Sequence, residues 1–307
     1  MSMRSLCLLA AVFLFTVFAQ AQIEVLSVQK LDLGADQDWY QPRFSPDGKS
    51  VYVTNSDFDG IWQYSLSSRE TRQITEDPKS GYGYSFSPDG QSIAYRRTFY
   101  NDRTYERTQE IVILNMQTGS SAVQASQGTL SVPVFAGATL MYAEAPQVQG
   151  LQKTALPAEP VLLGTEKTKI ALLLEGQKII FDPLKNGRYI WPALSPDKQK
   201  IVTYAMDAGT IVADLQGNVL ARLGRRDAAV WTRSGRWLAY MDDRDDGHQT
   251  ISSDLRAVSP DGLTTVQLTS TPDVKEMYPQ CSPTDDSIVF STAEGDVYVL
   301  TYREVAP

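Results

Sequence analysis

The stretch Pro42-Arg-Phe-Ser-Pro-Asp-Gly48 decides the fold, because the chain repeats it in the same surroundings. Five further copies, some of them weaker, begin at Tyr84, Pro133, Pro192, Ala229 and Pro279. A run of alternating apolar residues follows each copy, as Val51-Tyr-Val53 follows the first. Such alternation is typical of a half-buried β-strand. The copies follow one another at steps of about 37 to 59 residues, which indicates a repeat architecture.

Each repeat predicts four antiparallel strands. In the first repeat, Ile61-Trp-Gln-Tyr64 and Arg72-Gln-Ile-Thr75 are the third and fourth runs. Four-stranded units at this spacing are typical of a β-propeller, whose blades close into a ring. The last repeat ends near Tyr302 with three runs, and the run from Ile23 to Leu33 supplies the missing one. The sequence therefore predicts an all-β fold: a six-bladed β-propeller of four-stranded antiparallel blades, with the ring closed by the N-terminal strand joining the last blade. We expect the blades to start near residues 40, 82, 131, 190, 228 and 277.

The Ser-Pro-Asp-Gly phrase is explained as a tight turn between the first two strands of a blade. Proline presets φ, Asp bonds the local backbone, and Gly takes the positive φ that closes a hairpin. We therefore expect Asp47 and Asp89 to be structural and not catalytic. The copy Ser259-Pro-Asp-Gly262 stands later in its repeat, so we expect it to join a third strand to a fourth.

The N-terminal residues have the pattern of a secretory signal peptide. A basic start at Arg4 precedes an apolar run from Leu6 to Ala19, and Ala19-Gln-Ala21 resembles a cleavage site. We expect residues 1–21 to be removed and residues 22–307 to form a single domain without a transmembrane segment. The mature protein is then expected in the periplasm or outside the cell.

Charge and rare residues exclude several function classes. The formal net charge is -8, which disfavours binding to nucleic acid. Cys281 is the only cysteine after the leader, so the mature chain has no internal disulfide. His248 is the only histidine, which rules out a histidine-based metal cluster, and no Gly-x-Ser-x-Gly motif occurs. We therefore expect no catalytic residue and no cofactor.

The repeat resembles a known family. The first copy, together with Asn55-Ser-Asp-Phe-Asp-Gly-Ile-Trp-Gln-Tyr-Ser-Leu66 and Thr71-Arg-Gln-Ile-Thr-Glu-Asp-Pro78, resembles the WD-like repeat of the TolB-type β-propeller family. The resemblance covers nearly the whole mature chain. It implies the propeller fold and a place in the periplasm, where TolB belongs to the Tol-Pal envelope system. The chain passes from its leader into the first blade, so we expect the propeller alone, without the α/β domain that precedes it in TolB.

One face of the predicted ring carries the features of a binding surface. Long loops between second and third strands are expected at residues 97–108, 145–168 and 242–252, opposite the Ser-Pro-Asp-Gly turns. The segments that cross between blades on this face are aromatic, with Trp39, Tyr40, Tyr82, Tyr84, Tyr189, Trp191 and Tyr278. Such residues suit contacts with protein or sugar. Packing between blades is the alternative role for each of them.

The predicted function is that of a non-catalytic binding module. We expect a monomer whose loop face binds a protein partner in the cell envelope, or a glycan. The alternative is a propeller-type carbohydrate-active enzyme, a glycosidase or lyase, which two carboxyls about 5 to 10 Å apart in an aromatic funnel would support. Calcium at Asn55-Ser-Asp-Phe-Asp-Gly60 is also left open, although position twelve of that loop would be Leu66 instead of Glu.

Overall fold

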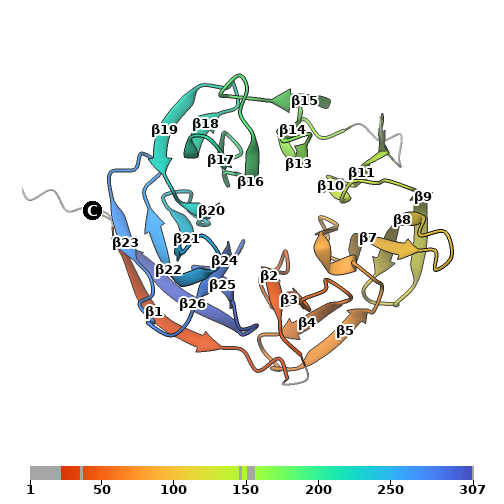
Figure 1. Cartoon of the computed structure of the whole chain (residues 1–307), viewed down its shortest axis with the longest axis horizontal. Coiled ribbons are helices and arrows are strands. Elements are labelled where there is room, and N and C mark those ends of the chain that lie inside the picture. The colour runs from red at the N-terminus through yellow and green to blue at the C-terminus, as the bar shows by residue number, and fades with distance from the viewer. Residues whose placement is uncertain (1–21, 35–36, 145–146, 151–155, 306–307) are drawn as a thin grey trace, which may run out of the picture.

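The predicted β-propeller is confirmed. A computed structural model describes residues 22–34, 37–144, 147–150 and 156–305, and it contains antiparallel sheets arranged in a ring (Figure 1). The expected leader, residues 1–21, lies outside the described residues. One short 3₁₀-helix, η1 (Ser80–Tyr82), accompanies the strands. None of the helical structure described is long and apolar enough to cross a membrane.

Five of the six predicted blades are four-stranded sheets. The first contains β2 (Tyr40–Phe44), β3 (Ser50–Thr54), β4 (Ile61–Ser65) and β5 (Thr71–Thr75). The second contains β6 (Tyr84–Phe86), β7 (Ser92–Tyr100), β8 (Arg107–Asn115) and β9 (Ser121–Gln127). The fourth contains β16 (Tyr189–Leu194), β17 (Lys200–Ala205), β18 (Gly209–Asp214) and β19 (Val219–Gly224). The fifth contains β20 (Asp227–Trp231), β21 (Leu238–Asp245), β22 (Thr250–Val258) and β23 (Thr265–Gln267).

The last blade closes the ring as predicted. It contains β24 (Glu276–Cys281), β25 (Ser287–Thr292) and β26 (Val297–Val305), and β1 (Gln22–Lys30) is its fourth strand. The pairing of β1 with β26 is antiparallel and runs from Gln22 opposite Val305 to Lys30 opposite Tyr298. The two ends of the described chain therefore hold the ring together.

The third repeat differs from the sequence expectation. Its strands form two three-stranded sheets, β10 (Val134–Ala136), β11 (Thr139–Glu144) and β12 (Gln147–Gly150), then β13 (Val161–Glu166), β14 (Lys169–Leu174) and β15 (Gln177–Phe181). The six repeats thus account for seven sheets among the described residues. The interpretation of 145–168 as one long loop is wrong, because β12 and β13 lie inside it. A register shift between Leu162 and Gly164 interrupts the alternation that would have marked β13.

The Ser-Pro-Asp-Gly phrase forms the predicted turn. Ser45 Oγ donates to Asp47 Oδ1 at 2.6 Å and accepts the backbone N–H of Ser50 at 3.0 Å. Gly48 has a φ of 70° and donates its N–H to the Ser45 carbonyl oxygen at 2.9 Å. Ser259 also bonds to Asp261, and its turn joins β22 to β23 as expected.

Apolar side chains of neighbouring blades form the core. Phe44 and Val51 of the first blade pack in one cluster with Val289 and Val297 of the last blade. Because this pattern continues from blade to blade, the inner strands are held at fixed positions around the central axis.

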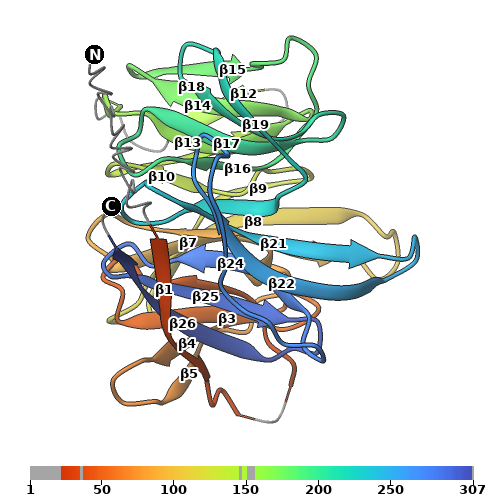
Figure 2. The same cartoon turned by 90° about the vertical axis from the view of Figure 1, so that its left-hand side faces the viewer.

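Two hairpins extend from one side of the ring. β7 pairs with β8 as far as Tyr100 opposite Arg107, and β21 pairs with β22 as far as Asp245 opposite Thr250. Figure 2 shows both hairpins reaching out on the side away from the C-terminus. This side is called the hairpin face below, and the Ser-Pro-Asp-Gly turns between first and second strands lie at the opposite ends of the strands.

Candidate functional site

The innermost strands of four consecutive sheets contain the same irregularity. Their pairing shifts register within β2, β16, β20 and β24. In each strand, the residue four positions before the turn serine or its equivalent has a positive φ of 50° to 54°, and these residues are Gln41, Trp191, Ala228 and Tyr278. This conformation costs a non-glycine residue about 1–2 kcal/mol. Bulges of this kind redirect side chains, and here all four residues line the central channel.

The bulges also explain the prolines of the repeat. Proline follows the bulged residue at Pro42, Pro192 and Pro279. Because proline has no N–H to give to a neighbouring strand, it is tolerated at bulges and at sheet edges. The repeat phrase therefore contains the turn at one end of the inner strand and, in three of the four bulged strands, a proline that the bulge tolerates.

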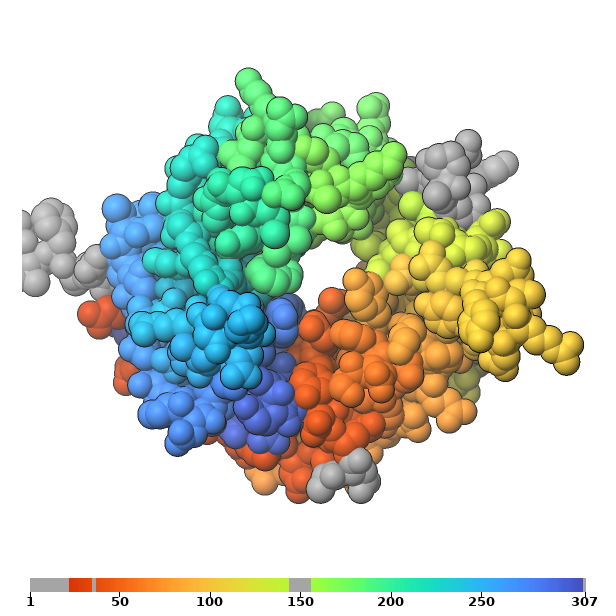
Figure 3. All heavy atoms as spheres, viewed as in Figure 1, coloured from red at the N-terminus to blue at the C-terminus, as the bar shows by residue number. Residues whose placement is uncertain are grey.

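A cavity of about 680 Å³ lies at the centre of the ring, bordered by the four bulged strands. Figure 3 shows the opening from the hairpin face. The lining side chains are mostly apolar or aromatic, and they are Gln41, Arg43, Phe58, Tyr82, Trp191, Pro192, Ala193, Ala228, Ala229, Val230, Tyr278 and Gln280. The size is in the range of ordinary ligand pockets.

Aromatic rings stand on two sides of this cavity. Trp191 packs edge-on against Tyr278, with ring centroids 6.3 Å apart, and against Tyr204 at 6.0 Å. Phe58 packs edge-on against Tyr82 with ring centroids 5.4 Å apart. Rings held by each other in this way offer contact area at low entropic cost.

The structure brings three of the seven predicted binding residues together. Tyr82, Trp191 and Tyr278 all line the cavity, and their relation to a ligand remains a proposal. Tyr40 is half-buried and donates its hydroxyl hydrogen to the Ala293 carbonyl oxygen at 3.4 Å.

The other three predicted residues belong to the core. Trp39 packs edge-on against Trp62 at 5.2 Å, and Tyr84 is buried beside Phe86 at 5.7 Å. Tyr189 is 1% exposed, and its hydroxyl donates to Asp182. The burial of these three side chains fits the alternative role that the sequence left open, packing between blades.

Sequence reasoning missed Gln41, Arg43, Phe58 and Gln280 as cavity residues. A signal for three of them was present in the repeat. Counting back from the turn serine, positions four and two before it give Gln41 and Arg43 in the first blade and Tyr278 and Gln280 in the last. These positions alternate with core positions such as Phe44, so they point toward the axis.

A pair of carboxyls lies close to the aromatic wall of the cavity. Asp227 and Asp243 both bind the guanidinium of Arg225, at 2.8 and 2.9 Å. Burial, followed by a hydrogen bond with Asp227 and its charge, raises the pKa of Asp243 to about 6. The pKa of Tyr278 is raised mainly by burial and also by the charges of these two carboxyls. Because both carboxyls bind the same guanidinium, each is engaged in an internal ion pair.

The acidic loop weighed as a calcium site binds an internal cation. Lys79 donates to the Asp57 carbonyl oxygen at 2.8 Å and forms an ion pair with Asp59 at 3.3 Å. Asn55 Oδ1 accepts the backbone N–H groups of Asp57 and Asp59. The ammonium group thus satisfies oxygens that a metal ion would need. In the part of the chain that the structure describes, no group of three or more His, Cys, Asp or Glu side chains is suited to a metal.

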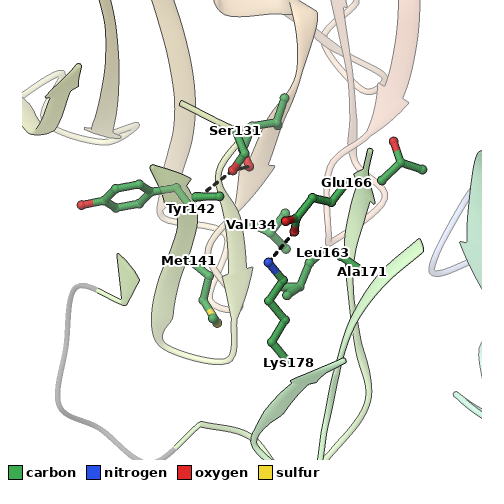
Figure 4. Close-up of a pocket in the computed structure, with 11 residues that line it drawn as sticks. Ser131, Val134, Met141, Tyr142, Leu163, Glu166, Ala171 and Lys178 are labelled. Carbon is green, nitrogen blue, oxygen red and sulfur yellow. Dashed lines mark hydrogen bonds and ion pairs between the residues drawn. The ribbon is translucent and has the colours of Figure 1, made fainter. Parts of the chain in front are cut away.

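A second hollow lies between the two sheets of the third repeat. Apolar residues such as Met141 and Leu163 line it, and the ion pair of Glu166 with Lys178 bridges one side (Figure 4). Its volume of about 80 Å³ is far smaller than that of the central cavity. The central channel is therefore the better candidate site.

Comparison with known proteins supports the fold. Neither the known family models nor the curated proteins match this chain. Oligogalacturonate lyase from Vibrio parahaemolyticus matches in structure with a TM-score of 0.51 and 14% identity, over 88% of this chain and 79% of the lyase. TolB from Acinetobacter baumannii matches with a TM-score of 0.50 and 16% identity over 76% of this chain, which spans 54% of TolB. The β-propeller domain of Cps50 (Swd1) from Myceliophteria thermophila matches with a TM-score of 0.60 and 10% identity, over 90% and 99% of the two chains.

These likenesses show a β-propeller. At identities this low, they show the fold alone.

Proposed function

We propose that this chain is a non-catalytic binding propeller, and that it takes an extended segment of a protein partner into the central channel from the hairpin face. The observation that carries the proposal is the arc of four bulged inner strands, in which strained backbone aims Gln41, Trp191 and Tyr278 at one cavity. Backbone strain of this kind is concentrated at binding and active sites. Four repeats of it around one channel favour a ligand there.

The lining favours a peptide over a glycan. Among the side chains that line the cavity, only those of Gln41, Arg43 and Gln280 carry amide or charged groups, apart from the tyrosine hydroxyls. A glycan would bury many hydroxyls, each of which needs a hydrogen-bond partner. Apolar side chains of a peptide fit better against Ala193, Val230 and the aromatic rings.

The place of action is proposed from the sequence. The leader pattern of residues 1–21 and the resemblance of the repeats to the TolB type support a periplasmic or secreted protein. The partner is then a protein of the cell envelope, and we propose that the propeller binds it as a monomer.

A blocked channel tests the proposal. Peptides would be selected from a displayed library on the immobilised wild-type protein and then measured on Ala193→Trp, which fills the channel. The matched control is Ala122→Trp, on the exposed face of the outer strand β9. We expect the selected peptides to bind wild type and A122W alike, and to bind A193W at least about 10-fold more weakly, a loss of about 1.4 kcal/mol. Equal binding to A193W, or no enrichment on wild type, would contradict the proposal.

A second candidate is the carbohydrate-active enzyme. One observation favours it: Asp227, which shares Arg225 with Asp243, directly precedes the cavity residue Ala228, and the raised pKa of Asp243, about 6, lets this carboxyl exchange a proton in mildly acidic solution. Turnover of trigalacturonate or of neutral oligosaccharides by the purified protein, lost in Asp243→Asn, would favour this function over binding alone.

A further inference from the structure

We propose that the segment bound in the channel carries an acidic side chain, and that the carboxylate binds Arg43 between the amides of Gln41 and Gln280. This inference rests on the proposed function, because it names the chemistry of the ligand in the same channel.

The repeat places Arg43 at a defined level of the channel. The residue two positions before the turn serine, or before its equivalent, lines the cavity in each of the four bulged strands. These residues are Arg43, Ala193, Val230 and Gln280. Arg43 is the only charged member of this set, and also the only charged side chain among the described residues that line the cavity. A charge at one point of an otherwise apolar or neutral wall is a specific feature.

The guanidinium of Arg43 is held in position but not neutralised. Its Nη1 donates to the Tyr84 carbonyl oxygen at 3.2 Å, and the group lies over the Tyr84 ring at 5.2 Å from the centroid. Arginine has five N–H donors, so most of them are left for a ligand. The side chain is exposed to the channel, and no carboxylate within the described ranges forms an ion pair with it.

The acidic residues around the channel have cations of their own. Asp59 pairs with Lys79, and Asp77 pairs with Arg97. Asp227 and Asp243 share Arg225. Arg43 therefore carries the charge in the cavity wall that a bound ligand would neutralise.

Two amides line the same cavity as the guanidinium. Gln41 comes from the same strand as Arg43, and Gln280 comes from β24, whose residues contact β2. Both glutamines line the same cavity. Arginine binds a carboxylate in a bidentate geometry, and amide N–H groups in the same cavity can donate further hydrogen bonds to its two oxygens.

One cation with two neutral amides fits a single negative charge. A phosphate carries nearly two charges and is usually bound by several cations or by a helix N-terminus, and the cavity wall offers neither. The apolar part of the same lining, with Ala193 and Val230, suits the neighbouring side chain of a peptide. An Asp or Glu next to an apolar residue is the ligand that these contacts favour.

Matched dipeptides test the inference. The probes are Ac-Phe-Glu-NH₂ and Ac-Phe-Gln-NH₂, which differ by one charge, with trigalacturonate as a carboxylate of another class. Binding would be measured by ligand-observed NMR on wild type, on Arg43→Gln, and on Arg222→Gln. Arg222 lies exposed on β19, so R222Q changes the net charge equally without touching the channel.

We expect wild type and R222Q to bind the Glu peptide about 10-fold more tightly than the Gln peptide, and R43Q to bind both equally. Equal binding of the two peptides to wild type, no binding of the Glu peptide, or a preference that survives in R43Q would overturn the inference. Tighter binding of trigalacturonate than of the Glu peptide would overturn the assignment of the ligand to a protein segment. The selected peptides and A193W test the proposed function, whereas the matched dipeptides and R43Q test this inference. The two claims can therefore fail separately.

Discussion

In the Ser-Pro-Asp-Gly turns between first and second strands, the serine side chain forms hydrogen bonds with the aspartate and with the backbone. Ser45 Oγ donates to Asp47, and the same contact joins Ser87 to Asp89 at 2.5 Å. The hydrogen bond from Ser45 is the main cause that lowers the pKa of Asp47. The pKa of Asp89 is lowered chiefly by its bond from Ser87. The ionised carboxylates therefore stabilise the turns.

We predict a pH-dependent cost for Asp47→Asn. A lowered folded pKa means that the contribution of Asp47 is present above the unfolded pKa of about 3.9 and is lost as pH falls through the folded pKa. Because the side chain is exposed, we expect a loss of at most about 1 kcal/mol at pH 7. Thermal unfolding at pH 7 and at pH 3 measures the difference, with Asp102→Asn in the exposed β7–β8 turn as the control. A loss that is as large at pH 3 as at pH 7 would contradict this role of the carboxylate.

The backbone decides which aromatic residues reach the channel. Tyr189 and Trp191 stand two positions apart, yet Tyr189 is 1% exposed and Trp191 is 37% exposed with a φ of 51°. The sequence predicted aromatic residues at the crossing segments. It could not predict the bulge, because a positive φ at tryptophan is enforced by the pairing of β16 with β17 and not by local propensity.

At the scale of elements, a buried carboxylate ties an inner strand to the outer part of its neighbouring blade. Glu276, the first residue of β24, is 1% exposed. It accepts hydrogen bonds from the hydroxyls of Thr269 and Thr271 and from the Leu255 N–H. Burial raises the pKa of this carboxyl, and the three donors compensate in part for the cost of the charge.

We predict that Glu276→Ala lowers the free energy of unfolding by about 3 kcal/mol, because it leaves buried donors without an acceptor. Glu276→Gln keeps one acceptor oxygen, so its loss should be smaller. Urea unfolding at pH 7 measures both variants, with Glu294→Ala in the exposed turn before β26 as the control. If E276A and E294A unfolded at the same urea concentration, the strand would not depend on this contact.

The third repeat shows the limit of pattern reading at this scale. The runs that form β14 and β15 are apolar enough to be recognised as strands. In β13, Gly164 lies at a register shift, and Lys167 and Thr168 form the next turn with positive φ values of 47° and 70°. These features interrupt the alternation of apolar and polar residues in the sequence. The two three-stranded sheets were therefore predicted as one blade with a long loop.

At the scale of the whole molecule, the repeats predicted the ring and the way it closes. The missing fourth strand of the last blade pointed to the N-terminal run, and β1 pairs with β26. The channel follows from closure, since every inner strand then faces one axis. The repeats did not predict how the walls of the channel differ. Four inner strands bulge in the same way, whereas the third repeat is split between two sheets.

The central claim is that a ligand binds inside the ring between the bulged strands. Hydrogen–deuterium exchange of the wild-type protein, with and without a peptide selected on it, tests this claim most directly. Slower exchange is predicted in β2, β16 and β24, the strands that carry Gln41, Trp191 and Tyr278, and unchanged exchange in the Ser-Pro-Asp-Gly turns. Protection of those turns or of the outer strands, without protection of the inner strands, would contradict the claim.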